Sequence, residues 1–144
     1  MVIGTRKALL IAAGLMLAPA TALGSELEIL VDNVASREGR LMVAVFDHSD
    51  DFPASQQRVA QAMVPAAPGG SRLVISGLAE GRYAVAVNHD RNGNGAQDRN
   101  LIGVPSEPYG FSNDARGFAG PPSFEAAAFE VKGPRTTVRI ALTR

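Results

Sequence analysis

The sequence predicts an all-β protein: an antiparallel β-sandwich of about seven strands, with one long ordered loop and at most one short helix. Short runs of alternating apolar and polar residues recur along the chain, and such runs are typical of strands with one buried face. Gly, Pro and Asn separate the runs. The crossover helices that a parallel sheet requires are missing from the pattern, which favours antiparallel strands.

The first residues have the layout of a secretory signal. Arg6 and Lys7 precede an apolar run over residues 8–18, and small residues follow at Ala22 and Gly24. We therefore expect residues 1–24 to be a signal peptide and residues 25–144 to form a single β-sandwich domain that is periplasmic or secreted. The apolar run is shorter than the about 20 residues that span a bilayer, so no membrane span is expected after cleavage.

Composition narrows the class of protein further. The chain has no cysteine, so an exported domain of this length must be held together by its apolar core rather than by disulfides. Without Arg6 and Lys7, 12 basic side chains stand against 14 acidic ones. No basic run or stripe is present, and we expect no nucleic acid partner.

Five segments show the alternation clearly, and each predicts one buried face. Two other segments alternate less regularly: residues 123–131 (SFEAAAFEV) are expected to form a further strand, and residues 53–63 fit either a short helix or a loose edge strand. The predicted inner faces are, in chain order, Leu27, Ile29 and Val31; Leu41, Val43 and Val45; Leu73 and Ile75; Tyr83, Val85 and Val87; and Val138, Ile140 and Leu142.

One connection between strands has a recognisable form. The stretch ISGLAEGRYAVAV, residues 75–87, resembles an element that recurs in transthyretin-like and other immunoglobulin-like sandwiches of exported proteins. The resemblance implies that Leu78 and Tyr83 pack inward. It bears on the fold and not on the function.

Residues 88–122 are too long and too irregular for a passive connection in a compact domain. Four of the eight aromatic residues lie in or beside this segment: Tyr109, Phe111, Phe118 and Phe124. Two interpretations are open. The rings plug one end of the sandwich, because each buried ring removes much apolar surface from water, or they form an exposed patch that faces a ligand.

The start of this segment, NHDRNGNGAQDRN, has the spacing of a Ca2+-binding loop. Counted from Asp90, side-chain oxygens fall at positions 1, 3, 5 and 9, with Gly95 at the sharp turn. The candidate ligands are the side chains of Asp90, Asn92, Asn94 and Asp98 and the backbone carbonyl of Ala96.

The loop departs from the EF-hand pattern at position 12, where Leu101 replaces the bidentate Glu. Glu107 or Asp114, later in the segment, could supply the missing carboxylate. Few charged ligands predict a weak site, with a dissociation constant of about 10⁻⁴ to 10⁻³ M. The alternative is a plain turn in which the two Asn-Gly pairs adopt left-handed conformations without any ion.

Catalytic chemistry has little support in the sequence. The only histidines, His48 and His89, lack the spacing of a zinc site, and we expect both in surface turns. No cysteine and no Gly-x-Ser-x-Gly motif offers a nucleophile. If the loop folds back, His89, Asp90 and Glu107 would form an acid/base cluster, and a small periplasmic hydrolase or lyase is one alternative function.

Three blocks, GRLMVAVFD, GLAEGRYAVAVNHDRNGNGAQDRNLIGVPSEPYGFSND and GPPSFEAAAFEV, together resemble the bacterial exported family catalogued as domain of unknown function 2141. The likeness covers nearly all of the chain after residue 24, and its most specific part is the central block. Asn88 stands where an aromatic or apolar residue is more usual. The resemblance implies an exported β-sandwich with no known activity, in which the polar loop and the aromatic segment form one unit.

The leading hypothesis is a binding or accessory module with a weak Ca2+ site in loop 90–98, completed by Glu107. Its partner would be a protein, a glycan or a small molecule. A purely structural envelope or adhesion module is the second alternative to it.

Overall fold

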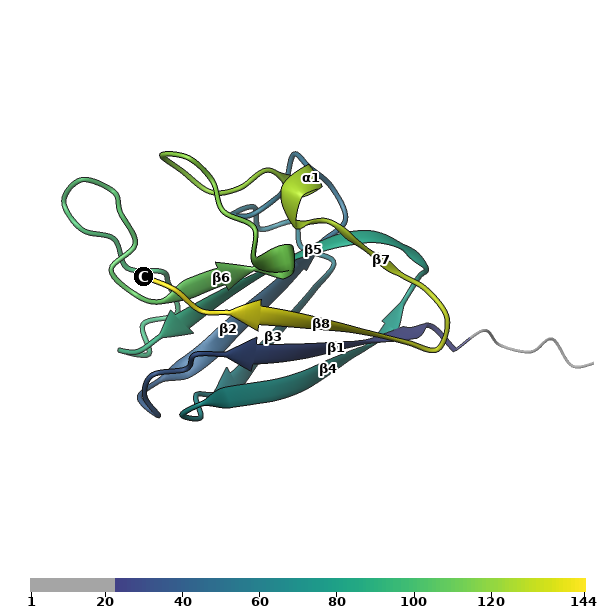
Figure 1. The fold of residues 1–144 in the computed structure, drawn as a ribbon, viewed down its shortest axis with the longest axis horizontal. Helices are drawn as coiled ribbons and strands as arrows, with labels where there is room; N and C mark the ends of the chain where they lie inside the picture. Colours follow the sequence, from purple (N-terminus) through teal and green to yellow (C-terminus); the bar gives the residue numbers. More distant parts are fainter. Residues whose placement is uncertain (1–22) are drawn as a thin grey trace, which may run out of the picture.

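The structure, a computed structural model, describes residues 23–144 and consists of two stacked β-sheets (Figure 1). The predicted signal peptide lies outside these residues except for its last two positions. No helix within the described range is long and apolar enough to cross a membrane. The strands are β1 (Ser25–Asp32), β2 (Arg40–Phe46), β3 (Ala60–Pro65), β4 (Gly70–Leu78), β5 (Gly81–Asp90), β6 (Tyr109–Phe111), β7 (Phe129–Val131) and β8 (Arg135–Ala141).

One sheet has the strand order β4-β1-β8, and the other has the order β3-β2-β5-β6, with β7 also paired to β5. The predicted all-β sandwich is therefore confirmed. One strand pair differs from the expected antiparallel arrangement, because β1 and β8 run parallel. Parallel neighbours cannot be joined by a short hairpin and need a long crossover connection. Here β1 and β8 are the first and last strands, and the chain between them provides that connection.

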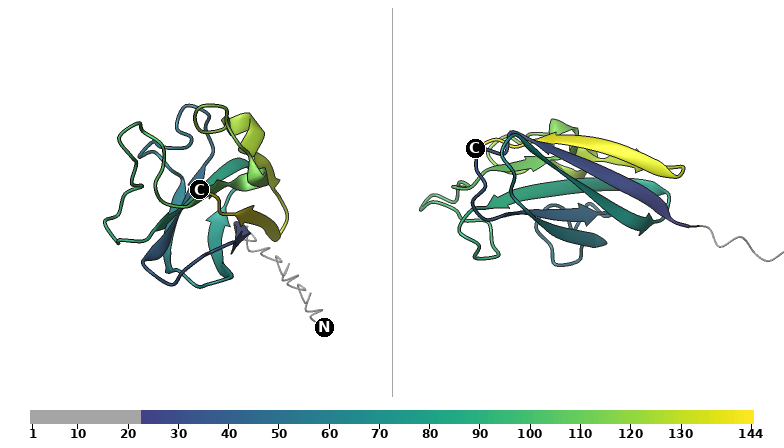
Figure 2. Two further views of the ribbon diagram at one scale, coloured as in Figure 1. Left: turned by 60° about the vertical axis from the view of Figure 1, so that its left-hand side comes forward. Right: turned by 90° about the horizontal axis from the view of Figure 1, so that it is seen from below.

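The predicted inner faces form the main core between the two sheets, whose arrangement is seen in two further views in Figure 2. In β1, Leu27, Ile29 and Val31 are buried while the residues between them are half-buried. The corresponding residues of β2, β4, β5 and β8 belong to the same cluster. On the outer side of the three-stranded sheet, carboxylates of β1 pair with arginines of β4 and β8, namely Glu26 with Arg135, Glu28 with Arg72 and Asp32 with Arg139.

The expected strand over residues 123–131 is only half correct. Residues Phe124–Ala127 form the helix α1, and β7 begins at Phe129. The Ser123 hydroxyl accepts a hydrogen bond from the Ala126 N–H at 3.2 Å and so caps the helix. The alanines that follow favour a helix over a strand. Within residues 53–63, by contrast, the edge-strand interpretation holds, since β3 begins at Ala60.

A second apolar cluster covers the outer face of the five-stranded sheet. Phe46 of β2, Ala84 of β5 and Phe124 and Ala127 of α1 are buried in it, and Phe52 and Phe111 pack against them. The Phe52 ring lies edge-on to Phe46, Phe111 and Phe124, with centroids 5.6, 5.7 and 6.1 Å away. In Figure 1, α1 lies over this face of the sheet. The five-stranded sheet is thus apolar on both faces.

Some aromatic rings of the long segment are buried, as expected for a plug at one end of the sandwich, and others are exposed, as expected for a patch that faces a ligand. Phe124 is buried and Phe111 is half-buried in the second cluster, which matches a plug. Phe118 is 102% exposed, and Tyr109 is half-buried beside Phe111 at a ring distance of 5.8 Å.

Candidate functional site

The polar loop leaves the end of β5 and returns as a hairpin to β6, which pairs with β5 (Figure 1). Arg99 and Pro105 form an isolated bridge near its tip, and the N–H of Asn100 donates to the carbonyl of Val104 at 2.9 Å. The turn places Leu101 at the tip, where it is 107% exposed. Leu101 therefore takes no part in the polar cluster.

Asp90 is the buried centre of the loop. Its side chain is 0% exposed and accepts hydrogen bonds from the N–H of Gly95 at 2.9 Å and of Asn94 at 3.1 Å. The Arg40 guanidinium approaches it at 3.4 Å. Burial by itself raises the pKa of Asp90, but hydrogen bonds from Gly95, Arg40 and Asn94 outweigh it, and the pKa lies below its ordinary value.

The start of β2 is shaped to receive this loop. Gly39 has a positive φ of 67°, and a Cβ atom at this position would lie 1.9 Å from the carbonyl oxygen of Asp90. Only glycine allows the two backbones to approach so closely. The next residue, Arg40, donates to the carbonyl of Gly93 at 3.1 Å as well as reaching Asp90.

The remaining polar side chains of the loop turn toward one another. The side-chain amides of Asn92 and Asn94 both donate to the Asp98 carboxylate, the latter at 2.7 Å. Their oxygens accept backbone N–H groups: Asn92 Oδ1 that of Asn94 at 3.1 Å, and Asn94 Oδ1 that of Ala96 at 3.0 Å. Three of the four side chains picked out by spacing therefore meet, whereas the Asp90 carboxylate is held by backbone N–H groups and Arg40, and Ala96 contributes its N–H.

Glu107 folds back onto the loop. Its carboxylate is nearly buried and accepts the N–H of Arg91 at 2.9 Å on one oxygen and the N–H of Asp98 at 3.1 Å on the other. It therefore ties the beginning of the loop to its end. Asp114, the other candidate, accepts the N–H of Ala141 in β8 at 2.9 Å and does not join the loop.

Across residues 23–144, no group of three or more His, Cys, Asp or Glu side chains is arranged to hold a metal ion. The side chains that meet in the loop include two that are not among these four residue types, the amides of Asn92 and Asn94. The arrangement holds the loop in one shape through hydrogen bonds from backbone and amide N–H groups to carboxylates.

The expectation that both histidines lie in surface turns is wrong for His89. His48 is exposed, but His89 is 0% exposed, because β5 continues to Asp90. His89 Nε2 lies 2.8 Å from the carbonyl oxygen of Glu38. Consecutive strand residues point to opposite faces, so His89 and Asp90 point apart, and none of the described hydrogen bonds joins His89, Asp90 and Glu107.

The lowered pKa of Asp90 predicts a pH dependence of stability. A carboxylate whose pKa is depressed on folding stabilises the native state above its unfolded pKa of 3.8, and this contribution is lost as pH falls through the folded pKa. We expect the urea midpoint of the native chain to fall more steeply below about pH 4 than that of Asp90→Asn. Glu28, whose pKa is lowered by hydrogen bonds from Thr137 and Arg72, contributes equally to the pH dependence of both proteins and so does not affect the comparison. If the urea midpoints of the two proteins fell in parallel, the assignment to Asp90 would be wrong.

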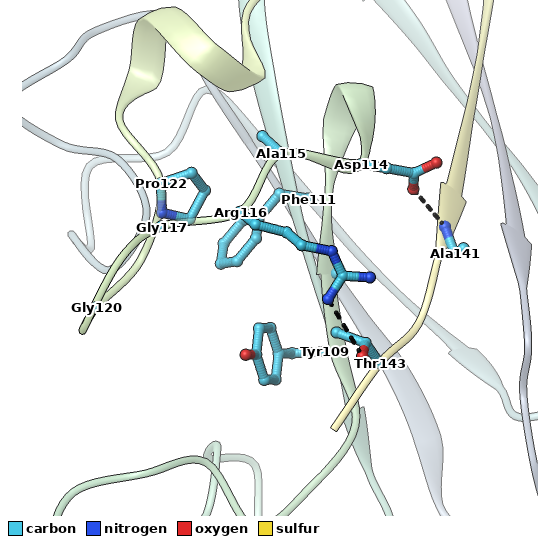
Figure 3. Close-up of a pocket in the computed structure, with 11 residues that line it drawn as sticks. Tyr109, Phe111, Asp114, Ala115, Arg116, Gly117, Gly120, Pro122, Ala141 and Thr143 are labelled. Carbon is cyan, nitrogen blue, oxygen red and sulfur yellow. Dashed lines mark hydrogen bonds between the residues drawn. The ribbon is translucent and has the colours of Figure 1, made fainter.

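A shallow pocket with a volume of about 120 Å³ lies between β6, residues 115–122 and the end of β8 (Figure 3). The Tyr109 and Phe111 rings line it, and Pro122 lies beside Phe111 in the view. The Arg116 guanidinium also borders the pocket, and its described hydrogen bond, to Thr143 Oγ1, is long at 3.5 Å. Aromatic faces beside a guanidinium suit a small flat or anionic group. Local sequence patterns gave no signal for Arg116 or Thr143.

The comparisons with known proteins give a family for the chain but no activity. No curated protein and no solved structure gave a significant match. A family model described as an uncharacterized protein conserved in bacteria (DUF2141) matches residues 29–139, which includes the polar loop, the aromatic segment and most of both sheets. The chain therefore belongs to the bacterial DUF2141 family.

Proposed function

We propose that the protein is a binding or accessory module and that its loop 90–98 holds a Ca2+ ion, which braces the binding end of the sandwich. The observation that carries this proposal is that the side chains of Asn92 and Asn94 meet the Asp98 carboxylate in a loop whose backbone N–H groups at positions 94 and 95 hold the Asp90 carboxylate. A loop wound in this way directs several oxygen atoms at one region, as Ca2+ requires.

The donor set suits a hard cation. Ca2+ takes six to eight oxygen ligands, and the loop offers carboxylates from Asp90, Asp98 and Glu107, side-chain carbonyls from Asn92 and Asn94, and the backbone carbonyl of Ala96. Both amide NH2 groups now donate to Asp98. Rotation of each amide would turn its oxygen toward the cation, which would replace these two hydrogen bonds and also the two that the amide oxygens now accept from the N–H groups of Asn94 and Ala96.

The binding role rests on what surrounds the loop. The tip of its hairpin exposes Leu101 and Ile102. The pocket beside Tyr109 and Arg116 is lined by β6, which begins two residues after Glu107. A cation that stiffens the loop would fix both features for a protein, glycan or small-molecule partner. Charged ligands are few, so we expect weak affinity, with a dissociation constant of about 10⁻⁴ to 10⁻³ M.

Thermal unfolding tests the ion directly. With about 10 mM Ca2+, roughly 10 to 100 times the expected dissociation constant, an ion bound only by the folded state adds about 1.4 to 2.7 kcal/mol, so Tm should be higher than with chelator at equal ionic strength. Asp98→Asn should abolish the shift, because it removes a charged ligand. It should lower the ion-free Tm only slightly, because Asp98 is half-buried and the Asn oxygen still accepts one of the two amide hydrogen bonds.

The matched control is Asp114→Asn, since that carboxylate lies outside the loop and bonds to Ala141. It should keep the full Ca2+ response. Equal Tm values with Ca2+ and with chelator in the native chain would remove the ion from the proposal and leave a loop held by hydrogen bonds alone.

A further inference from the structure

The strand β3 is an open edge of the five-stranded sheet. It pairs with β2 on one side, and no described residue pairs with its other side. The N–H of Ala66 donates to the carbonyl of Gly39, so alternate residues counted back from Ala66 face β2. The backbone N–H and C=O groups of Gln61 and Met63 therefore point away from the sheet.

This edge lacks the features that usually protect a sheet edge. Charged side chains, prolines within the strand, or a covering segment normally prevent another strand from adding. No charged residue occurs from Val59 to Ser71, and the single proline of β3, Pro65, is its last residue. Met63 is 58% exposed and Val59 is 45% exposed.

The other edges of the fold differ from β3. In the three-stranded sheet, β4 and β8 carry Arg72, Arg135 and Arg139, each paired with a carboxylate of β1. At the far side of the five-stranded sheet, β6 has only three residues, and Tyr109 bridges to Thr143 beyond β8. Among the described strands, β3 is the long edge without charge.

We propose that β3 is a dimer interface, at which β3 of a second copy of this chain adds in antiparallel orientation. Two copies of the same strand that pair in antiparallel orientation are related by a twofold axis, and twofold symmetry is the commonest symmetry of protein dimers. With the axis at Ala62, Gln61 lies opposite Met63 of the second copy, and these outward-facing residues exchange N–H···O bonds in both directions. The two five-stranded sheets become one continuous sheet.

Charge favours a second copy as the occupant. The facing strands are neutral along their whole length, so two identical segments meet without like-charge repulsion. The nearest charged residue, Arg58, comes opposite Ala66 of the second copy. The dimer also leaves the loop 90–107 and the pocket free, because β3 lies at the opposite edge of the sheet from β6.

Sedimentation velocity of residues 23–144, which contain both apolar clusters and every described strand, tests the proposal. From micromolar to submillimolar concentration, the native chain should shift from monomer to dimer. Met63→Lys, which places a charge at the edge, should abolish the shift. Val74→Lys is the control, since Val74 is an exposed apolar residue of β4, and this variant should dimerise like the native chain.

A native chain that stays monomeric throughout, or a Met63→Lys variant that still dimerises, would overturn the proposal; the former would leave the edge for a strand of another protein. Because the chain has no cysteine, Ala62→Cys gives an independent measurement. Residues directly opposite in a non-hydrogen-bonded pair have Cα atoms about 4.5 Å apart, within the range of a disulfide.

Mild oxidation should therefore convert Ala62→Cys to a covalent dimer, at concentrations where Val74→Cys remains monomeric. Equal rates of cross-linking in the two variants would mean random collision and would count against the twofold axis at Ala62.

Discussion

Replacement of Phe46 by alanine is expected to lower the free energy of unfolding by about 3–5 kcal/mol. Phe46 is the largest of the fully buried side chains, and it joins the five-stranded sheet to the ring of Phe52 and to α1. Removing the ring leaves a cavity under Phe52, which also contacts Phe111 and Phe124. Urea unfolding followed by circular dichroism measures the loss.

Phe118→Ala is the matched control, because this ring is fully exposed. Surface substitutions usually change stability by less than about 0.5 kcal/mol, so the two phenylalanines of the same fold should differ several-fold in effect. A Phe46→Ala variant as stable as Phe118→Ala would mean that α1 and the long segment do not pack on this face of the sheet.

Asp90→Ala is expected to cost about 3 kcal/mol, because hydrogen bonds to a charged group each contribute about 1.5–3 kcal/mol and the substitution removes the buried carboxylate that accepts them. The N–H of Gly95 would lose its acceptor. The N–H of Asn94 would keep only Asn92 Oδ1, and the Arg40 guanidinium only the carbonyl of Gly93. Urea unfolding in chelator, at neutral pH, separates this effect from any bound cation.

Asp98→Ala serves as the comparison, because Asp98 is half-buried and its carboxylate contacts amides of the loop itself. We expect a loss of less than about 1 kcal/mol, as for an exposed polar interaction. If the two substitutions were equally destabilising, Asp90 would not be the centre on which the loop is built.

Period-2 alternation predicted the main core well, because residues such as Leu27, Ile29 and Val31 need only one strand conformation to share a face. The second cluster could not be read in the same way. Alanines alternate with valines in β5 and look like weakly apolar solvent positions, yet Ala84 is buried beneath Phe124, which arrives from 40 residues later in the chain. Burial of that kind depends on tertiary packing.

In the candidate site, too, features set by local sequence were predicted, whereas features set by tertiary packing were missed. Spacing alone predicted that Asn92, Asn94 and Asp98 lie close together, because a tightly turning loop makes their proximity a local property. The contributions of Gly39 and Arg40 were missed, since Arg40 reaches Asp90 through the register of β2 against β5. His89 was misplaced for a related reason: the strand continues to Asp90 rather than ending before the loop.

The parallel pairing of β1 with β8 gives the domain a defined response to force. β1 begins at the end of the sandwich opposite to that at which β8 ends (Figure 1), so tension applied through the two ends of the domain would pull these neighbours past each other. The pairs from Glu26↔Arg135 to Asp32↔Ala141 would then be loaded together in shear rather than opened one at a time. A domain loaded in this way resists stretching more strongly than one unzipped from a hairpin end.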